Sequence, residues 1–350
     1  MNYETILDIG ERKREKSGIN EDSIAATSID FGHRDTERTI GVFVIADGAG
    51  GHQDGDAASY LATDRVLKDL VPSVISTVRR RSSAAGLNMV GDEDDPPPLE
   101  ATIHEALEDA VLAAHRDILE YAGEAKAEPV TTVVTAVCID DRLYYAWVGD
   151  SRAYVINRSS ERISLLTRDH SKIETKRRAG EISDAEAEVH VDGNQITRAL
   201  GGSHYEDPET SKVDVASDTV RVYADDLILL TSDGLIDAYL DAPHLHHQFR
   251  DAEDVQPIVE EIMQRSVTDD EIRDIVLSAA SLEAGLQALV NMANERGGKD
   301  NLSIVLADEL PAPPTPETLP SRGIRETPED IESQETIVRD AESDSKSEPT

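Results

Sequence analysis

Cysteine is almost absent from this chain, since Cys138 is the only one among 350 residues. A single cysteine excludes a disulfide within the chain and excludes a cluster of thiolate metal ligands. Cys138 lies in the apolar run 133–139, which predicts a small buried side chain without a chemical role. Long apolar runs are missing too, because no stretch approaches the ~20 residues that span a membrane. The first 16 residues contain no apolar core of signal-peptide length, so we expect a soluble, cytoplasmic protein.

Basic residues are scarce. The chain has 34 Lys and Arg against 71 Asp and Glu, which gives a formal net charge of −37. Nucleic acids and anionic membranes would repel such a protein, so we expect neither as a partner. Arginine outnumbers lysine, and the acidic residues are spread along the whole chain. This pattern suits a protein kept soluble in a salty cytoplasm, and a halophilic origin is our hypothesis for it.

Two segments differ from the rest in composition. Residues 80–99 combine small residues, an acidic run and three prolines, which predicts an exposed loop between helices. Residues 311–350 contain seven prolines, ten acidic residues and four basic ones. They show almost no apolar periodicity, so we expect a disordered acidic tail. The folded domain is therefore expected to cover about residues 1–310.

Strand patterns dominate the middle of the chain. The segments 131–140, 142–150 and 153–157 are strongly apolar and follow one another across very short turns. Connections this short permit only antiparallel pairing. Further strands are expected at 39–46, 219–223, 227–231 and 302–307, and helices at 56–78, 99–121, 254–265 and 279–296. The economical arrangement is an α+β fold with antiparallel sheets in the centre and helix pairs outside.

Acidic residues stand where several of these apolar strands end. Asp47, Asp150 and Asp233 each terminate a strand, and Asp300 precedes the last one. Together with Glu21–Asp22 they can converge at one edge of the sheets. Converging carboxylates need a hard cation, which favours Mg²⁺ or Mn²⁺ over zinc. Taken singly, each aspartate in so acidic a chain fits a solvated charge or a turn residue better than a metal ligand, and only the joint arrangement favours the metal site.

The order of motifs resembles that of the metal-dependent serine/threonine protein phosphatases, the type-2C or PPM family, over about residues 5–308. The matching segments are NED at 20–22, VIADGAGGH at 44–52, TT at 131–132, GDSR at 149–152, LTRDHS at 166–171, NQITRALG at 194–201, LTSDGL at 230–235 and GKDNL at 298–302. The resemblance implies a sandwich of two antiparallel sheets flanked by pairs of antiparallel helices, in four αββα layers. Residues 171–193 would form the flap segment beside the site.

The resemblance also implies the principal metal ligands. Asp47 would bridge two Mn²⁺ or Mg²⁺ ions, and the Gly48 carbonyl would assist it. Glu21 would complete one ion, while Asp233 and Asp300 would hold the other. A water that bridges the two ions would attack the phosphorus of phosphoserine or phosphothreonine.

Two further acidic residues have implied roles. Asp22 would fix metal-bound waters, and Asp150 with Asp233 would form a weaker third metal site. With Asp47 and Asp233, Asp22 completes the set that we expect to support catalysis.

The chain departs from the family pattern at the position that grips the substrate phosphate. Most members have an arginine four residues before the motif glutamate, where this chain has Ser17. Arg14 or Lys16 would then supply the cation, because arginine and lysine bind phosphate strongly. Ala49 replaces the histidine that eukaryotic members have after the bridging Asp-Gly.

The expected partners are phosphorylated proteins, the substrates of kinases. A binding-only pseudophosphatase that recognises phosphoproteins is the alternative, and a nuclease is disfavoured by the net charge. In the tail, Thr336 lies among acidic residues and precedes an Ile-Val pair. It resembles the phosphothreonine segments that forkhead-associated domains bind, whereas the plainer interpretation is a solubilising tail.

Overall fold

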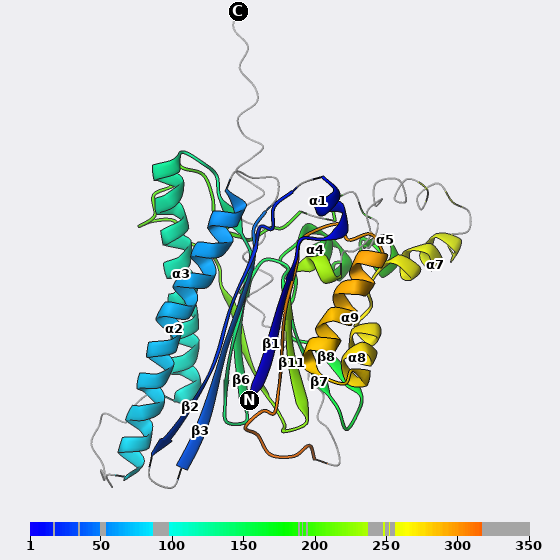
Figure 1. Ribbon diagram of the computed structural model, residues 1–350. Coiled ribbons are helices and arrows are strands. Elements are labelled where there is room, and N and C mark those ends of the chain that lie inside the picture. Colours follow the sequence, from blue (N-terminus) through cyan, green and yellow to red (C-terminus); the bar gives the residue numbers. More distant parts are fainter. Residues whose placement is uncertain are drawn as a thin grey trace, which may run out of the picture.

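The computed structural model describes residues 1–316, apart from 17, 34–35, 50–53, 87–97, 188–189, 191, 194, 237–247, 249–251 and 253–255. Two β-sheets face each other in the centre, and helices cover both outer faces (Figure 1). The predicted tail segment around Thr336 and the position of Ser17 lie outside the described residues. No helix of the described part is long and apolar enough to cross a bilayer.

The first sheet has five antiparallel strands. In spatial order they are β10 (Ala216–Arg221), β6 (Arg142–Val148), β5 (Val133–Ile139), β3 (Thr36–Asp47) and β2 (Asp22–His33). The turn at 140–141 joins β5 to β6 as a hairpin, and Asp140 takes a left-handed φ of 52° there. The predicted antiparallel pairing of 131–140 with 142–150 is confirmed. The predicted pairing of 142–150 with 153–157 is wrong, because β6 lies in this sheet and the next strand of the chain lies in the second sheet, so the short turn at 149–151 carries the chain from one sheet to the other.

The second sheet also has five antiparallel strands. Their order is β1 (Asn2–Asp8), β12 (Leu302–Asp308), β11 (Asp226–Thr231), β7 (Arg152–Asn157) and β8 (Arg162–Leu165). The first and last strands of the described residues therefore pair with each other, in register from Asn2–Asp308 to Asp8–Leu302. A short pair, β4 (Val130–Thr131) with β9 (Leu200–Gly201), lies beside the first sheet.

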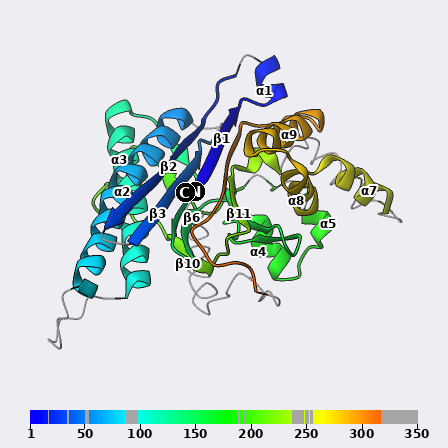
Figure 2. The same cartoon turned by 60° about the horizontal axis from the view of Figure 1, so that its bottom comes forward.

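Long helices pack on the first sheet, and shorter ones on the second. Helix α2 (Gly55–Gly86) contacts β2 and β3, while α3 (Leu99–Ala125) contacts β6 and β10. On the opposite side α8 (Asp269–Ser278) and α9 (Leu282–Glu295) pack against β8, β1 and β12 (Figures 1 and 2). The remaining described helices are α1 (Glu11–Glu15), α4 (Lys172–Arg178), α5 (Asp184–Ala187), the 3₁₀ turn η1 (Asp233–Leu235) and α7 (Gln256–Arg265).

Three apolar cores separate the four layers. One lies between α2, α3 and the first sheet, another between the sheets, and the third between the second sheet and α8 and α9. Helix α3 shows why the first core forms, since its buried residues Ile103, Leu107 and Val111 recur every four positions. The predicted α+β sandwich flanked by helix pairs is confirmed.

Several boundaries differ from the sequence-based expectation. Helix α2 continues to Gly86, seven residues into the segment expected to be a loop, and residues 87–97 lie outside the described part. The packed chain also continues beyond residue 310. Thr315 bonds with Asp225 and Asn157, and Ala312 packs on the core between the sheets. Residues 311–316 thus belong to the folded domain, because they satisfy polar groups at the far end of β7 and β11.

Candidate active site

Strand register brings the acidic residues of the first sheet together. Asp22 begins β2 and Asp47 ends β3, and the antiparallel pairing places them directly opposite each other. Glu21 immediately precedes Asp22, so three carboxylates leave the same edge of this sheet. Sequence spacing could not show this pairing, because it depends on β2, which was not predicted.

The second sheet presents its acidic residues at the same edge. Arg152 and Ile304 each lie opposite Thr231 in the strand register. Asp233, two residues after Thr231, therefore leaves its strand beside Asp150 and Asp300, which precede β7 and β12. The charges of Asp22, Asp233 and Asp300 act on Asp47, so these four carboxylates lie close together at this edge.

Hydrogen bonds join the rims of the two sheets. The Ser232 hydroxyl donates to Asp22 Oδ2 at 2.7 Å, and the backbone N–H of Ser303 donates to Ser232 Oγ at 3.0 Å. Asn301 bridges in the same way, because its Oδ1 accepts a 2.8 Å bond from the Glu21 N–H while its amide donates to the carbonyls of Ile9 and Ile19. These bonds hold the acidic residues on a rigid frame.

The loop after β3 is fixed by backbone bonds. Asp47 N–H donates to Thr132 Oγ1 at 3.1 Å, and Thr131 Oγ1 donates to the Asp47 carbonyl at 2.8 Å. Gly48 N–H donates to the Glu21 carbonyl at 3.1 Å. A side chain at Gly48 would collide with the carbonyl oxygens of Gly55 and Glu21, so only glycine permits this close approach.

The convergence of carboxylates changes their proton affinity. Burial raises the pKa of Asp22 to about 6. Burial also raises the pKa of Asp47 well above its usual range, and the charges of Asp22, Asp233 and Asp300 raise it further. Although Asp47 retains some contact with solvent, these neighbours leave its negative charge poorly compensated. Such a site favours either a shared proton or a bound cation.

Lys13 contacts the acidic cluster, and sequence reasoning did not single it out. Its Nζ lies 2.5 Å from Asp300 Oδ1, 3.1 Å from Glu21 Oε2 and 2.8 Å from Asn301 Oδ1. Burial lowers the pKa of this amine, but the bonds and charges of Asp300 and Glu21 outweigh that effect and raise it overall. The basic run 11–16 was the only signal for it in the sequence.

A pocket opens beside the acidic cluster. Its volume is about 560 Å³, and its lining residues are Arg12, Lys13, Lys16, Gly18, Ile19, Glu21, Lys299 and Asp300. Lys16 therefore lines the pocket beside the acidic cluster. Arg14 does not line it, because its guanidinium pairs with Asp8 at 2.8 Å and with Glu11 at 3.4 Å.

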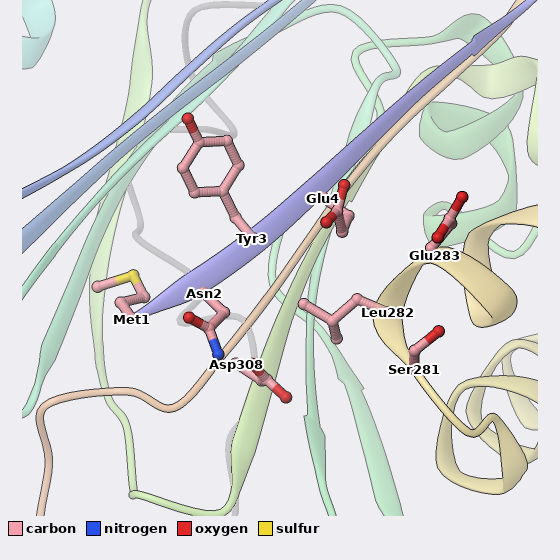
Figure 3. Close-up of a pocket in the computed structure, with 8 residues that line it drawn as sticks. All are labelled: Met1, Asn2, Tyr3, Glu4, Ser281, Leu282, Glu283 and Asp308. Carbon is pink, nitrogen blue, oxygen red and sulfur yellow. The ribbon is translucent and has the colours of Figure 1, made fainter.

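Another pocket lies at the other end of β1, lined by the starts of β1 and α9 and by Asp308 (Figure 3). Asp8 lies at the end of β1 that meets the active-site rim, whereas Asn2 lines this pocket. Asn2 and Asp8 are the two ends of this seven-residue strand, so the pocket and the rim lie about 20 Å apart. The acidic side chains of Glu4, Glu283 and Asp308 would repel a phosphate, so this pocket does not fit the substrate.

The flap and the loop around Asp150 have clear structural supports. Arg152 pairs with Asp169 at 2.7 Å, and His170 Nδ1 accepts the Gly149 N–H at 3.1 Å while the His170 ring stacks on Trp147. In the flap, Lys176 pairs with Asp192 at 3.2 Å. Arg152 and His170 therefore support the Gly149–Asp150 turn.

The residues present fit a divalent metal centre. The donors are carboxylates and a backbone carbonyl, which Mn²⁺ and Mg²⁺ prefer, and the buried Asp22 Oδ1 has no hydrogen-bond partner. Within the described residues, no three acidic, histidine or cysteine side chains are arranged so that they could hold a metal ion together without moving. Lys13 pairs with Glu21 and Asp300. The side chains of Asp47 and Asp233 share a hydrogen bond.

The chain is similar in sequence and in fold to known serine/threonine phosphatases. The serine/threonine phosphatase stp of Listeria innocua is 28% identical over 267 residues, which cover 76% of this chain and 84% of that protein. The crystal structure of the Mycobacterium tuberculosis serine/threonine phosphatase PstP/Ppp is 25% identical, with a TM-score of 0.58 over 88% of this chain and 97% of that one. A structure of the PstP catalytic domain with two manganese ions has 24% identity and a TM-score of 0.54, covering 88% of this chain and 97% of its own.

The family model described as protein phosphatase 2C matches residues 9–287, most of the folded domain. That range includes Glu21, Asp47, Asp150 and Asp233, while Asp300 follows it. The chain therefore belongs to the protein phosphatase 2C family.

Proposed function

We propose that this chain hydrolyses phosphoserine and phosphothreonine in phosphorylated proteins, with Mn²⁺ or Mg²⁺ as cofactor. The main support for this proposal is that Asp22, Asp47, Asp233 and Asp300 converge from two sheets beside a pocket with basic residues. Membership of the 2C family and the similarity to the stp phosphatase support the same reaction. The binding-only alternative is not favoured, since the acidic set is retained and the relatives are phosphatases.

The proposed metal ligands follow from where the side chains lie. Asp47 would be shared between two ions and Gly48 would supply a backbone carbonyl, with Glu21 on one ion and Asp233 and Asp300 on the other. When bound, the two ions would supply an activated water and neutralise charge on the phosphate. Asp150 would contribute to a weaker third position next to Asp233.

Asp22 has a different proposed role. Ser232 holds its Oδ2, so its other oxygen, Oδ1, is kept inside the site and is available to accept a hydrogen bond from water. We propose that Asp22 orients water in the site, and that the rigid bond to Ser232 sets its direction.

Substrate phosphate would enter through the pocket beside Asp300. Lys16 is exposed on its wall, and Arg12 and Lys299 add positive charge to a strongly anionic protein. Arg14 remains a weaker candidate because Asp8 and Glu11 engage it. Ile19, 59% exposed on the same wall, offers an apolar contact to the peptide around the phosphorylated residue.

The direct test measures phosphate release from a phosphothreonine peptide by the purified full chain. Activity should require Mn²⁺ or Mg²⁺, disappear with a chelator, and fall by on the order of 100-fold in Asp233→Asn. Asp109→Asn, an exposed change on α3 that removes the same charge, is the matched control. Metal-independent hydrolysis, or an Asp233→Asn variant as active as the control, would refute the proposed function.

We propose that the protein functions in the cytoplasm of a salt-adapted cell. The net charge of −37 and the single cysteine support this location. Activity and stability should then rise with salt up to molar concentration, because salt screens the self-repulsion. Unchanged stability between 0.1 and 2 M KCl would count against the halophilic origin.

We also propose that phosphorylated Thr336 binds a forkhead-associated domain. Phosphate would add about −1.5 to −2 charge and three acceptor oxygens to a threonine followed by Ile337 and Val338. A 326–345 peptide with phosphate at Thr336 should bind a purified forkhead-associated domain, and the same peptide without phosphate should not. Equal binding of the two peptides would leave the tail as a solubilising segment.

A further inference from the structure

We infer that Lys13 is a built-in competitor of the divalent metal: its ammonium group occupies Glu21 and Asp300 when metal is absent and must leave them when metal binds. The inference rests on the proposed function, which assigns these two carboxylates to the two different ions. It goes further by assigning a role to a lysine that the metal site itself does not require.

The ammonium group is fully engaged by the site. A lysine ammonium has three N–H donors, and Lys13 Nζ has three acceptors within reach: Asp300 Oδ1 at 2.5 Å, Asn301 Oδ1 at 2.8 Å and Glu21 Oε2 at 3.1 Å. The side chain is 22% exposed and that of Glu21 is 14% exposed. An ion pair this sheltered is screened less than one on the open surface.

The backbone of α1 holds Lys13 in this place. The Glu11 N–H donates to Asn294 Oδ1 at 2.8 Å, and the Arg12 N–H donates to the Gly298 carbonyl at 3.1 Å. The chain also approaches the Asp300 carbonyl so closely at Gly10 that a side chain there would collide with it. Helix α1 is therefore fastened to the loop that carries Asp300, and Lys13 is aimed at the carboxylates by the fold.

A divalent ion at Glu21 or Asp300 would meet the ammonium group at close range. The two positive charges repel each other, and both need the same oxygens. Lys13 therefore stabilises the metal-free protein and weakens metal binding at the same time. The open space next to it is the pocket with Lys16 and Lys299, so the displaced ammonium moves toward the place proposed for the substrate phosphate.

The first test is a Mn²⁺ titration by calorimetry on the full chain. Lys13→Gln keeps length and hydrogen bonding but removes the charge, and it should tighten Mn²⁺ binding about tenfold. Lys16→Gln removes an equal charge from the same pocket without touching Glu21 or Asp300, so it should leave the Mn²⁺ affinity within about twofold of the unmodified protein. Unchanged or weaker binding by Lys13→Gln, or equal tightening by Lys16→Gln, would overturn the inference.

The second test uses the unmodified protein and so does not depend on how a variant folds. Amine acetylation followed by peptide mass spectrometry measures the accessibility of Lys13 with and without Mn²⁺. Lys13 should become several-fold more reactive when Mn²⁺ is added, while Lys16 should react equally in both states. Mn²⁺ binding without a rise at Lys13 would overturn the inference and leave the proposed function standing, whereas no Mn²⁺ binding at all would overturn both.

Discussion

The Ser232 hydroxyl donates a 2.7 Å hydrogen bond to Asp22 Oδ2 and thereby joins the two sheets at the active-site rim. Ser232 is fully buried and Asp22 is 8% exposed. Removal of a donor from a buried carboxylate is costly, because no water replaces it. Loss of this bond should therefore lower the stability of the protein.

Ser232→Ala should destabilise the protein by about 1–3 kcal/mol and lower activity, since Asp22 loses the group that sets its direction. Urea denaturation with and without Mn²⁺ measures the stability, and phosphate release measures the activity. Ser278→Ala, at the exposed end of α8, should cost less than about 0.5 kcal/mol. Equal effects of the two changes would show that the bond between the sheets has no special weight.

Asp47→Asn should leave the metal-free protein as stable as the parent or more stable. The pKa of Asp47 is raised in the folded state, so folding favours its protonated form. Stability of the parent therefore falls as pH rises above the ordinary carboxyl pKa, and the amide avoids that loss. Thermal melting in a chelator at pH 4 and pH 7 should show the advantage of Asn growing with pH.

Mn²⁺ should raise the melting temperature of the parent but not that of Asp47→Asn, because the side chain proposed to bind both ions is lost. Asp109→Asn, exposed on α3, should respond to Mn²⁺ like the parent. A clear drop in the chelator melting temperature of Asp47→Asn would contradict the proposed electrostatic stress.

Lys16→Ala should raise the KM for a phosphothreonine peptide about threefold to tenfold with a smaller effect on kcat, because it removes a cation from the pocket wall. Arg14→Ala should change KM less, since Asp8 and Glu11 hold that guanidinium outside the pocket. Steady-state kinetics on both variants decide between the two cations. A larger KM effect from Arg14 would reverse the assignment.

Glu271→Gln should destabilise the domain by about 1–2 kcal/mol at pH 7. Glu271 accepts bonds from both terminal nitrogens of Arg296 and from the Thr268 N–H. The side-chain bond to Arg296 is the main reason that its pKa falls to about 2. This stabilisation is complete above a pH of about 4.5 and is lost as pH falls toward 2.

The stability difference between Glu271→Gln and the parent should therefore shrink between pH 5 and pH 3. Denaturant titrations at these pH values measure it. Glu283→Gln, in the first turn of α9, is the control and should change stability at pH 7 by less than about 0.5 kcal/mol. A difference independent of pH would show that the carboxylate charge does not matter.

A chain that ends at residue 316 should be more stable than a chain that ends at 310, by about 1–2 kcal/mol. The six extra residues supply the Thr315 bonds with Asp225 and Asn157, and the Pro313 carbonyl accepts the Ala224 N–H at 2.8 Å. Thermal melting of the two truncations measures the difference. Identical melting temperatures would place the domain boundary at 310, as composition alone suggested.

The sequence by itself determined the central hairpin and the identity of the acidic residues at the strand ends. The turn at 140–141 is too short for any pairing but antiparallel, and Asp47 and Asp233 interrupt strongly apolar strands. The equally short turn at 149–151 joins β6 to β7 in different sheets, so turn length did not decide that connection. The ordered motifs then sufficed to indicate the family. These signals depend on residues that are neighbours in the sequence, so they can be recognised without knowledge of the fold.

Only the tertiary structure decided which residues meet. Strands β1 and β2 mix polar and apolar residues too evenly to be recognised from the sequence. Yet the pairing of β2 with β3 places Asp22 against Asp47, and the pairing of β1 with β12 brings α1 to Asp300. Lys13 looks like one more solvated cation in a basic run, and its partner Asp300 is far away in the sequence. The physical reason is that an ion pair depends on distance in space, which strand register sets and residue type does not reveal.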